Sequence, residues 1–230
     1  YENYHVRKYG FHGTSHRFVS KKCIELLGNP EHSKIVTCHL GNGSSVSCSR
    51  GGKCVDTSMG LTPLEGPPMG TRCGSIDPAI VPFLMEKLNL TPAEMDTYMN
   101  KKSGMLGISG VSSDFRDLDA ASKEGNERAE LALQMFAYKV KQYIGSYAAA
   151  LNGVDAIVFT AGVGENDRRM REMILSDMDF LGVQVDFNYN AECPRGEEVE
   201  LSTKESKVHV YVIPTDEEMT IAHDTAALAL

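Results

Sequence analysis

The sequence of 230 residues lacks any apolar run close to the 18 residues that a membrane-spanning helix requires. Its first residues, Tyr1-Glu2-Asn3-Tyr4-His5, have no apolar segment of the kind found in a signal peptide. The first residue is not methionine, which is compatible with processing, removal of a tag or a fragment. We therefore expect a cytoplasmic protein that has no membrane partner.

The chain also has fewer basic than acidic residues. The 23 Lys and Arg residues stand against 31 Asp and Glu residues, and the formal net charge is −8. Nucleic-acid binding proteins need a basic excess to neutralise phosphates, and here only the pairs Lys101-Lys102 and Arg168-Arg169 supply local clusters. Such pairs are more typical of solvated helix faces, so we expect no nucleic-acid partner.

The six cysteines include no CxxC pair and no zinc-ligand spacing. With 42% hydrophobic residues the chain can bury a core without disulfide bonds, as one large domain or two small ones. We expect reduced thiols. No internal repeat, low-complexity segment or long linker is present, which favours one domain with residues 58–72 as its longest irregular segment.

The apolar pattern predicts a mixed α/β sheet. Residues 34–40, 45–49 and 53–57 are rich in β-formers, and the turn at Arg50-Gly51-Gly52 predicts an antiparallel meander of three strands. Two further apolar runs, residues 155–162 and 208–213, have the character of buried central strands.

Helices are expected between and after these strands. The longest, residues 126–151, carries one apolar stripe at i, i+3 and i+4 spacing. Five more helices are predicted, several of them from Ser, Thr or Asp capping residues, at 77–87, 91–100, 112–122, 167–181 and 216–230. A meander followed by alternating helices and strands indicates an α/β sheet of mixed direction.

Two glycine-rich segments follow predicted strands. In Gly41-Asn42-Gly43-Ser44-Ser45, backbone N–H groups without Cβ atoms nearby are able to close around phosphate oxygens. Gly162-Val163-Gly164-Glu165-Asn166 precedes the helix expected from Asp167, where an anion would be favoured, although such a turn also needs glycine for steric reasons. Neither GxGxxG nor GxxxxGK[ST] occurs, so a nucleotide would be held between separate turns.

Longer motifs carry a resemblance to a known family. In order along the chain they are YGFHGTSH (9–16), HLGNGSS (39–45), MGTRCGSIDP (69–78), SDFR (113–116), FTAGVGEN (159–166) and IPTDEE (213–218). Together they cover essentially the whole sequence and strongly resemble acetate kinase, of the acetokinase family, within the actin, Hsp70 and sugar-kinase architecture.

The resemblance implies a fold and an activity. The fold would be an actin-like ATPase (ribonuclease H-like) α/β domain, a mixed sheet with a three-stranded antiparallel meander and flanking helices. Residues 1–230 would be the C-terminal nucleotide-binding domain, without the N-terminal domain. The family transfers the γ-phosphoryl group of ATP reversibly to acetate, giving acetyl phosphate and ADP by direct in-line transfer with Mg²⁺. We expect the isolated chain to be inactive, and we expect a homodimer formed through this domain.

The resemblance also implies site residues. His12 and Arg72 match the groups that stabilise the transition state. Gly41, Asn42 and Gly43, with His39 and Leu40 at the start, match the loop for the β- and γ-phosphates. The residues beside the adenosine would be Asp114, Phe115 and Arg116, with Arg116 stacked on the base, and the pocket wall would be Gly162, Val163, Gly164, Glu165 and Asn166.

Each assignment has a structural alternative. Arg72 would otherwise pair with a carboxylate such as Asp77, and Asp114 would only cap a helix. His12 and His16 are four residues apart, but Gly13 is expected to interrupt a helix and no Glu follows His12, so an HExxH-type zinc site is not supported. His16 is expected to be a supporting residue.

A candidate magnesium ligand lies near the C-terminus. Glu217 and Glu218 are adjacent, so only one of them can face a site, and Thr215 and Glu218 have capping-box spacing. Glu217 is therefore the expected metal residue, acting through water molecules. Asp216 stands where the family usually has asparagine, and its extra charge would either sharpen or distort such a site.

Two rival functions remain at this point. A propionate or butyrate kinase would share the same nucleotide elements and differ in its acyl pocket. A non-catalytic actin-like nucleotide-binding module would use the glycine loops but would have no purpose for Arg72 and His12.

Overall fold

The computed structural model describes residues 1–229, so the last residue of the predicted C-terminal helix lies outside the described chain. The sequence favours one domain, whereas the backbone contacts separate two compact units. We call them the helical unit (Tyr1–Gly10, Gly41–Ser44 and Ser58–Lys139) and the sheet unit (Phe11–Leu40, Ser45–Thr57 and Val140 onward). That residues 1–230 form a C-terminal nucleotide-binding domain stays a prediction.

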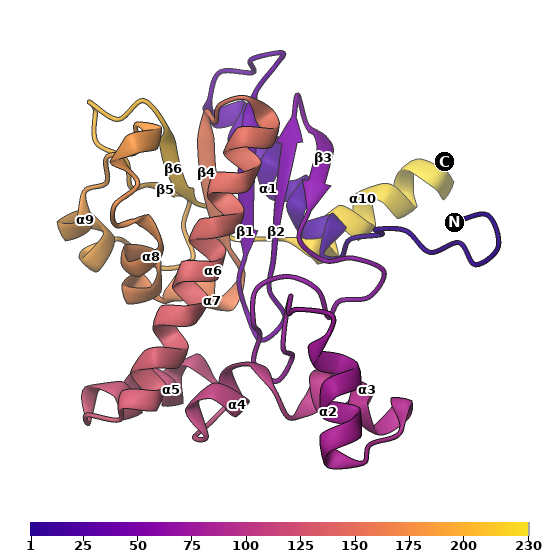
Figure 1. Ribbon diagram of the computed structural model, residues 1–230. Helices are drawn as coiled ribbons and strands as arrows, with labels where there is room; N and C mark the ends of the chain where they lie inside the picture. The colour runs from indigo at the N-terminus through magenta and orange to yellow at the C-terminus, as the bar shows by residue number, and fades with distance from the viewer. Residues whose placement is uncertain (230) are drawn as a thin grey trace. The chain divides into compact units, whose positions relative to one another are not determined.

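The sheet unit is built on one six-stranded sheet (Figure 1). Its strand order is β3-β2-β1-β4-β6-β5, in which β1, β2 and β3 form the antiparallel meander and β1, β4 and β6 run parallel. The strands are β1 (Lys34–His39), β2 (Ser45–Arg50), β3 (Lys53–Thr57), β4 (Ala156–Thr160), β5 (Val199–Glu200) and β6 (His209–Val212). The predicted α/β fold, a mixed sheet with a three-stranded antiparallel meander and flanking helices, is confirmed.

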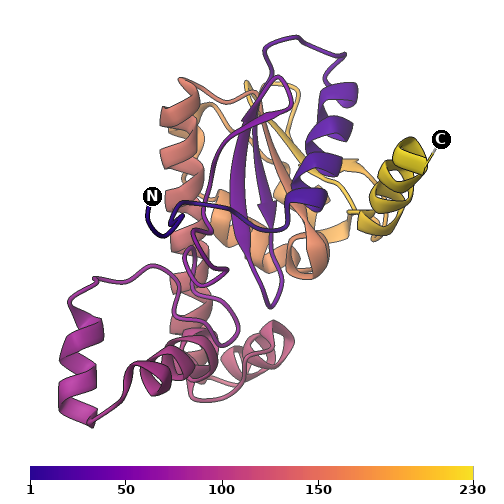
Figure 2. The same ribbon diagram turned by 90° about the vertical axis from the view of Figure 1, so that its right-hand side faces the viewer.

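Helices cover both faces of this sheet (Figure 2). On one face, Val19 and Cys23 of α1 (Gly13–Leu26) pack in a buried cluster with Ile35, Val158 and Tyr211 of the strands. On the other face lies the part of α6 (Glu127–Leu151) that belongs to the sheet unit. Because neighbouring strand residues point to opposite faces, the wholly buried runs of β1 and β4 require both layers.

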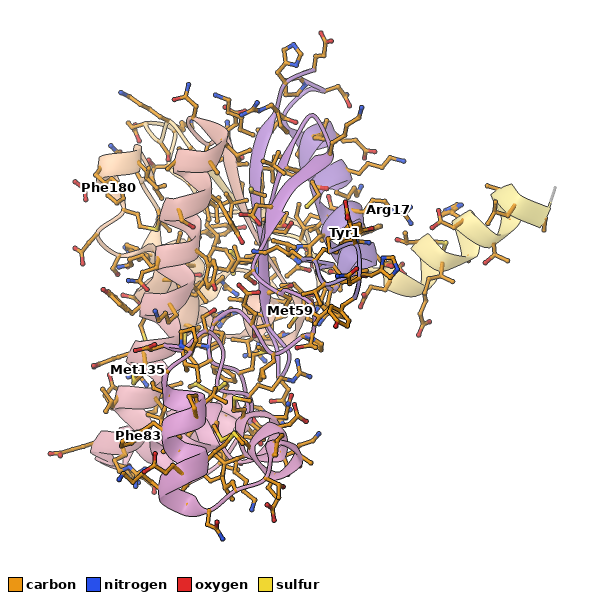
Figure 3. All side chains as sticks on the ribbon, turned by 45° about the vertical axis from the view of Figure 1, so that its right-hand side comes forward. Tyr1, Arg17, Met59, Phe83, Met135 and Phe180 are labelled. Atoms are coloured by element: carbon orange, nitrogen blue, oxygen red, sulfur yellow. The ribbon has the colours of Figure 1, made fainter. Side chains whose placement is uncertain are left out.

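The remaining helices of the sheet unit follow β4 or end the chain. They are α7 (Ala161–Asn166), α8 (Arg168–Leu175), the 3₁₀ turn at Asp179–Leu181, α9 (Phe187–Glu192) and α10 (Glu217–Ala229). An ion pair between Arg17 of α1 and Asp224 joins α10 to α1, and Figure 3 labels Arg17 on α1.

The helical unit contains α2 (Ile80–Leu88), α3 (Pro92–Lys101), α4 (Gly104–Ser109), α5 (Phe115–Lys123) and the first part of α6. A capping box between Thr91 and Glu94 starts α3. The rings of Phe115 and Phe136 meet edge to face, with centroids 4.7 Å apart, and pack α5 against α6. No helix within residues 1–229 has the length and apolar character needed to cross a bilayer.

Several predicted boundaries are wrong for identifiable reasons. The helix expected over 167–181 stops at Leu175, because Ser176 is extended and Asp177 has a φ of +57°. The strand expected over 155–162 ends at Thr160, and Ala161 onward forms α7 instead. Gly13 does not interrupt a helix but begins α1, with His12 in the left-handed conformation before it. The elements α1, α4, α9 and β5 were not predicted.

Candidate active site

In the sheet unit, Leu40, which precedes the first glycine segment, and the second glycine segment (residues 162–166) lie where parallel strands end. Leu40 follows β1, and its N–H donates to the carbonyl of Thr160 at the end of β4 (3.0 Å). The carbonyl of Leu40 accepts hydrogen bonds from the N–H groups of Val163 (2.8 Å) and Gly164 (3.2 Å). The start of one glycine segment is therefore joined to the other at the carboxyl edge of the sheet, which is where α/β folds bind ligands.

The second glycine segment differs from its predicted shape. Residues 162–166 lie within α7 itself, and α8 is a separate helix whose N-cap is Asp167, with the Asp167 carboxylate accepting from Met170 N–H (2.9 Å). Gly164 is buried, and a Cβ there would lie in ordinary van der Waals contact, 3.4 Å from the carbonyl oxygen of Cys38. Alanine would need only small adjustments at this position.

Glu165 ties α7 to the loop that precedes α10. Its Oε1 atom accepts hydrogen bonds from the N–H of Ala161 (2.7 Å) and the N–H of Thr215 (3.3 Å). This carboxylate thus connects two of the predicted site segments within the sheet unit.

Arg171 supports the same segment, and sequence reasoning missed it. Its side chain is fully buried, and Nη1 donates to the carbonyls of Gly164 (2.9 Å) and Glu165 (2.8 Å), while Nε donates to Asn190 Oδ1 (2.8 Å). Burial lowers the pKa of this guanidinium. The only signal in the sequence is an arginine on the apolar side of an amphipathic helix, which does not by itself indicate a buried role.

Three histidines gather at the start of α1 and the end of β1. The rings of His12 and His39 are stacked, with centroids 4.0 Å apart and planes 15° from parallel. His12 Nδ1 lies 2.9 Å from Ser45 Oγ, and His39 Nδ1 lies 2.8 Å from Ser15 Oγ. His16 contacts Thr37 Oγ1 (2.7 Å) and Ser45 Oγ (2.7 Å), so it does support the ring of His12 through Ser45.

Two of these imidazoles are neutral at neutral pH. Burial, followed by the neighbouring charges of His39 and His12, lowers the pKa of His16 to about 3. Burial and the neighbouring charge of His12 lower the pKa of His39 to about 3 as well. A neutral ring has one donor and one acceptor nitrogen, so the hydrogen bonds of His16 and His39 are directional.

The start of α10 corrects one prediction. The N-cap is Asp216, whose Oδ1 accepts from Met219 N–H (2.8 Å), and Thr215 and Glu218 do not form the capping box. The carboxylate of Asp216 therefore caps the N-terminus of α10. Glu217 is partly buried and Glu218 is exposed, in keeping with only one of them facing inward.

No cluster of three or more His, Cys, Asp or Glu side chains within residues 1–229 has a geometry suited to holding a metal ion. Carboxylate oxygens are nevertheless the donors that Mg²⁺ prefers, and this ion commonly keeps several water ligands. A single carboxylate such as Glu217 fits that manner of binding.

In the helical unit, the predicted phosphate loop meets the loop that carries Arg72. The carbonyl of Asn42 accepts from Gly70 N–H (3.2 Å). A Cβ on Gly70 would lie 3.0 Å from Asn42 Oδ1 and 3.1 Å from the carbonyl oxygen of Ser113. The side chain of Ser44 closes the loop by bonding both the N–H (3.1 Å) and the carbonyl (2.8 Å) of Gly41. Three predicted site segments therefore converge at Gly70.

Arg72 itself is held without a carboxylate. Its Nη1 atom donates to the carbonyl of Pro63 (3.0 Å) and contacts Met69 Sδ (3.4 Å). Within the part of the chain that the structure describes, Arg72 makes no ion pair, so the alternative pairing with Asp77 is not observed. A guanidinium held by a carbonyl and a thioether keeps its charge available to an anion.

The adenosine segment has local bonds of its own. Asp114 caps α5 by accepting from Arg116 N–H (2.8 Å), and the Arg116 side chain also donates to Asp114 through Nε (3.0 Å) and Nη2 (2.6 Å). These hydrogen bonds lower the pKa of Asp114 to about 2. Phe115 is buried against Phe136, so its side chain belongs to the core.

Comparison with known proteins defines the family. The chain matches the acetokinase family over residues 1–223, and it belongs to this family. The acetate kinase of Methanosarcina acetivorans is 61% identical over 226 residues, covering 98% of this chain and 55% of that protein. The chain thus spans about half the length of the curated relatives it matches.

Solved structures agree with this assignment. The crystal structure of Porphyromonas gingivalis acetate kinase matches with a TM-score of 0.94 and 51% identity, covering 98% of this chain and 56% of that one. A propionate kinase from Francisella tularensis matches with a TM-score of 0.87 and 40% identity, covering 94% of this chain and 55% of that one.

Proposed function

We propose that this chain is the C-terminal, nucleotide-binding domain of an acetate kinase, which transfers the γ-phosphoryl group of ATP reversibly to acetate and so makes acetyl phosphate and ADP. The observation that carries the proposal is the acetokinase match over residues 1–223. The 61% identity to an acetate kinase supports acetate as the acceptor.

The nucleotide would be held by main-chain amides. The loop of Gly41, Asn42 and Gly43, which follows His39 and Leu40, would surround the β- and γ-phosphates, with the N–H groups of Asn42 and Gly43 as donors because Gly41 N–H already donates to Ser44. Asp114 and Arg116 would lie beside the adenosine, and residues 162–166 would belong to the wall of its pocket. Glu217 would hold Mg²⁺ through water, and this ion, when bound, neutralises phosphate charge.

Arg72 and His12 would act on the transferring group. A carboxylate oxygen of acetate forms a bond to the γ-phosphorus while the bond from that phosphorus to the β,γ-bridging oxygen breaks, and ADP leaves. Phosphoryl transfer needs alignment and stabilisation of charge on the equatorial oxygens. The guanidinium of Arg72 and the imidazole of His12 would donate hydrogen bonds to those oxygens in the transition state.

The proposal also covers the location, the oligomeric state and the partners of the protein. We infer a cytoplasmic homodimer that pairs through this domain, as in the family that the motifs resemble. Its partners would be ATP or ADP and acetate or acetyl phosphate, with neither a nucleic acid nor a membrane. Sedimentation of the whole protein tests the dimer, and a monomer at micromolar concentration would contradict it.

Propionate is an alternative acceptor, because the chain is 40% identical to a propionate kinase of the same fold. Acetate, propionate and butyrate should be compared by kcat/KM in the same preparation. We expect acetate to be the best substrate, and a higher kcat/KM for either longer acid would reassign the chain.

The direct test is formation of acetyl phosphate from ATP, Mg²⁺ and acetate, trapped as the hydroxamate, by the whole protein that contains this chain. Acetate-dependent ADP release is the expected result, and nucleotide binding without any turnover would favour a non-catalytic module. The isolated 230-residue chain is expected to bind ATP weakly and to turn over nothing.

A further inference from the structure

A continuous row of hydrogen-bonding groups runs from β2 through β1 and α1 to His12. Thr37 Oγ1 lies 3.4 Å from the carbonyl oxygen of Ser47, and His16 Nδ1 lies 2.7 Å from Thr37 Oγ1. His16 Nε2 lies 2.7 Å from Ser45 Oγ, which in turn lies 2.9 Å from His12 Nδ1. We call this row the Ser47–His12 relay. All of its members belong to the sheet unit.

Only one placement of protons turns all four contacts into hydrogen bonds. A carbonyl can only accept, so the single hydroxyl proton of Thr37 goes to Ser47. Thr37 must then accept from a proton on His16 Nδ1. Because His16 is neutral, its Nε2 carries no proton and accepts from the hydroxyl of Ser45. That proton is now used, so Ser45 must accept from a proton on His12 Nδ1.

We propose that Ser45 and His16 are positioning residues that hold His12 with a proton on Nδ1, so that its charge changes by gain or loss of a proton at Nε2. The proposal rests on the proposed function only in giving His12 a role in phosphoryl transfer. It assigns the tautomer from the geometry of the relay, independently of that role.

This arrangement suits a group that must be charged in the transition state. The proton on Nδ1 is common to neutral and cationic imidazole, so the relay keeps every hydrogen bond when His12 becomes an imidazolium. With the relay reversed, Ser45 would donate to His12 Nδ1, and protonation of that nitrogen would require the hydroxyls of Ser45 and Thr37 to rotate and His16 to change its tautomer. A preorganised donor avoids this cost at the moment of reaction.

The neighbouring His39 does not belong to the relay. It stacks on His12 and is bonded through its own Nδ1 to Ser15 (2.8 Å). Ser15 is therefore a matched control: its hydroxyl is buried in the same cluster and bonds His39, and within residues 1–229 the structure gives this hydroxyl no hydrogen bond to the ring of His12 or of His16.

The first test needs no variant. The whole protein, with ¹⁵N-labelled histidine, is titrated by NMR, and the tautomer of neutral His12 is assigned from its two ring ¹⁵N shifts. We expect a protonated Nδ1 and an unprotonated Nε2. A neutral His12 whose proton resides on Nε2 overturns the proposal, whatever the activity of the protein.

The second test compares Ser45→Ala, Ser45→Thr and Ser15→Ala. We expect Ser45→Ala to shift His12 toward the Nε2–H tautomer and to lower kcat about tenfold with little change in the KM for ATP, as loss of a transition-state interaction does. Ser45→Thr should restore both, and Ser15→Ala should keep the tautomer. If Ser45→Ala retains the Nδ1–H form, the relay is not its cause and the proposal is wrong.

The two readouts separate this proposal from the proposed function. A tautomer that follows Ser45 while kcat stays constant supports the relay and contradicts the catalytic role of His12. A fall in kcat without any change of tautomer leaves the proposed function intact and contradicts the relay.

Discussion

The backbone of Gly104 lies directly against the carbonyl group of Arg72: a Cβ on Gly104 would stand 2.5 Å from Arg72 O and 2.1 Å from Met69 O. The φ of Gly104 is +60°, a conformation that side-chain-bearing residues rarely adopt. Two further bonds, from Met105 N–H to the Met69 carbonyl (2.9 Å) and from Ser103 N–H to the Thr71 carbonyl (3.0 Å), join α4 to this loop. The loop that carries Arg72 is therefore shaped by the start of α4.

Gly104→Ala should accordingly destabilise the protein and displace Arg72. The left-handed conformation costs roughly 1–2 kcal/mol for alanine, and the contacts with two carbonyl oxygens add to this cost. The free energy of unfolding in urea measures the total. Gly125→Ala is the matched control, because its φ of +91° is also positive but nothing lies within 4 Å of the added Cβ. Equal losses for the two variants would show that the contact with Arg72 is not tight.

Arg171→Ala should lower both stability and nucleotide affinity. It leaves the carbonyls of Gly164 and Glu165 without their donor and opens a cavity where a fully buried side chain was. Loss of charged hydrogen bonds inside a protein costs about 1.5–3 kcal/mol each, so we expect a total of about 3 kcal/mol or more in urea unfolding.

The exposed Arg195 offers the control for this change, and its alanine variant should stay within about 0.5 kcal/mol of the parent. In the whole enzyme, Arg171→Ala should raise the KM for ATP more than it lowers kcat. An Arg171→Ala protein of unchanged stability would contradict the structural account of residues 164–165.

Nucleotide binding should change the titration of Asp114. Hydrogen bonds from Arg116 lower the pKa of Asp114 to about 2, so the stabilisation they give is complete above the unfolded value near 4 and is lost as the pH falls through about 2. If Arg116 turns to stack on the adenine, the side-chain bonds are broken and this pKa rises. Carbon-13 NMR of the Asp114 carboxyl with and without ADP measures it.

Arg116→Ala gives the reference for that experiment, because without the side-chain hydrogen bonds the pKa of Asp114 should be higher than in the parent and should not respond to ADP. The backbone N–H of residue 116 still caps α5 in this variant, so the helix is retained. An Asp114 pKa that ADP leaves unchanged in the parent would mean that Arg116 stays on Asp114 and does not stack.

Arg72→Ala should reduce kcat by about 10²- to 10³-fold with little effect on the KM for ATP, which is the usual result of removing one preorganised donor to a transition state. Arg72→Lys should recover only part of the rate, since lysine lacks the planar fork. A loss of less than tenfold for Arg72→Ala in the whole enzyme would refute the assigned role.

The elements that could be predicted are those with a strong local signal. The meander was predicted from its β-forming residues and from the turn at Gly51-Gly52, and both glycines have positive φ. The helix over 126–151 is found almost to the residue, because Asn126 caps it and one apolar stripe continues through 25 residues. In contrast, α1 has few apolar residues and begins at a glycine, so its burial comes from tertiary packing that no local pattern shows.

The candidate site was predictable in its residues but not in its connections. The motifs predict Asn42, Arg72 and Asp114 as site residues, but the meeting of their segments at Gly70 depends on contacts between residues distant in sequence. The contacts of Arg171 and Ser45 were not predicted, because their partners are distant in sequence. The helix from Asp216 was predicted, but so was a capping box of Thr215 and Glu218, and only the geometry shows that Asp216 is the cap.

We propose that Arg72 and His12 both act on the terminal phosphate of the bound nucleotide. A crystal structure of the whole protein with Mg²⁺, ADP, aluminium fluoride and acetate tests it most directly. We predict that the Arg72 guanidinium and the His12 imidazole each lie about 2.7–3.2 Å from a fluorine atom of the phosphoryl mimic. Either side chain lying more than about 6 Å from the mimic, too far even for one bridging water, would contradict the account.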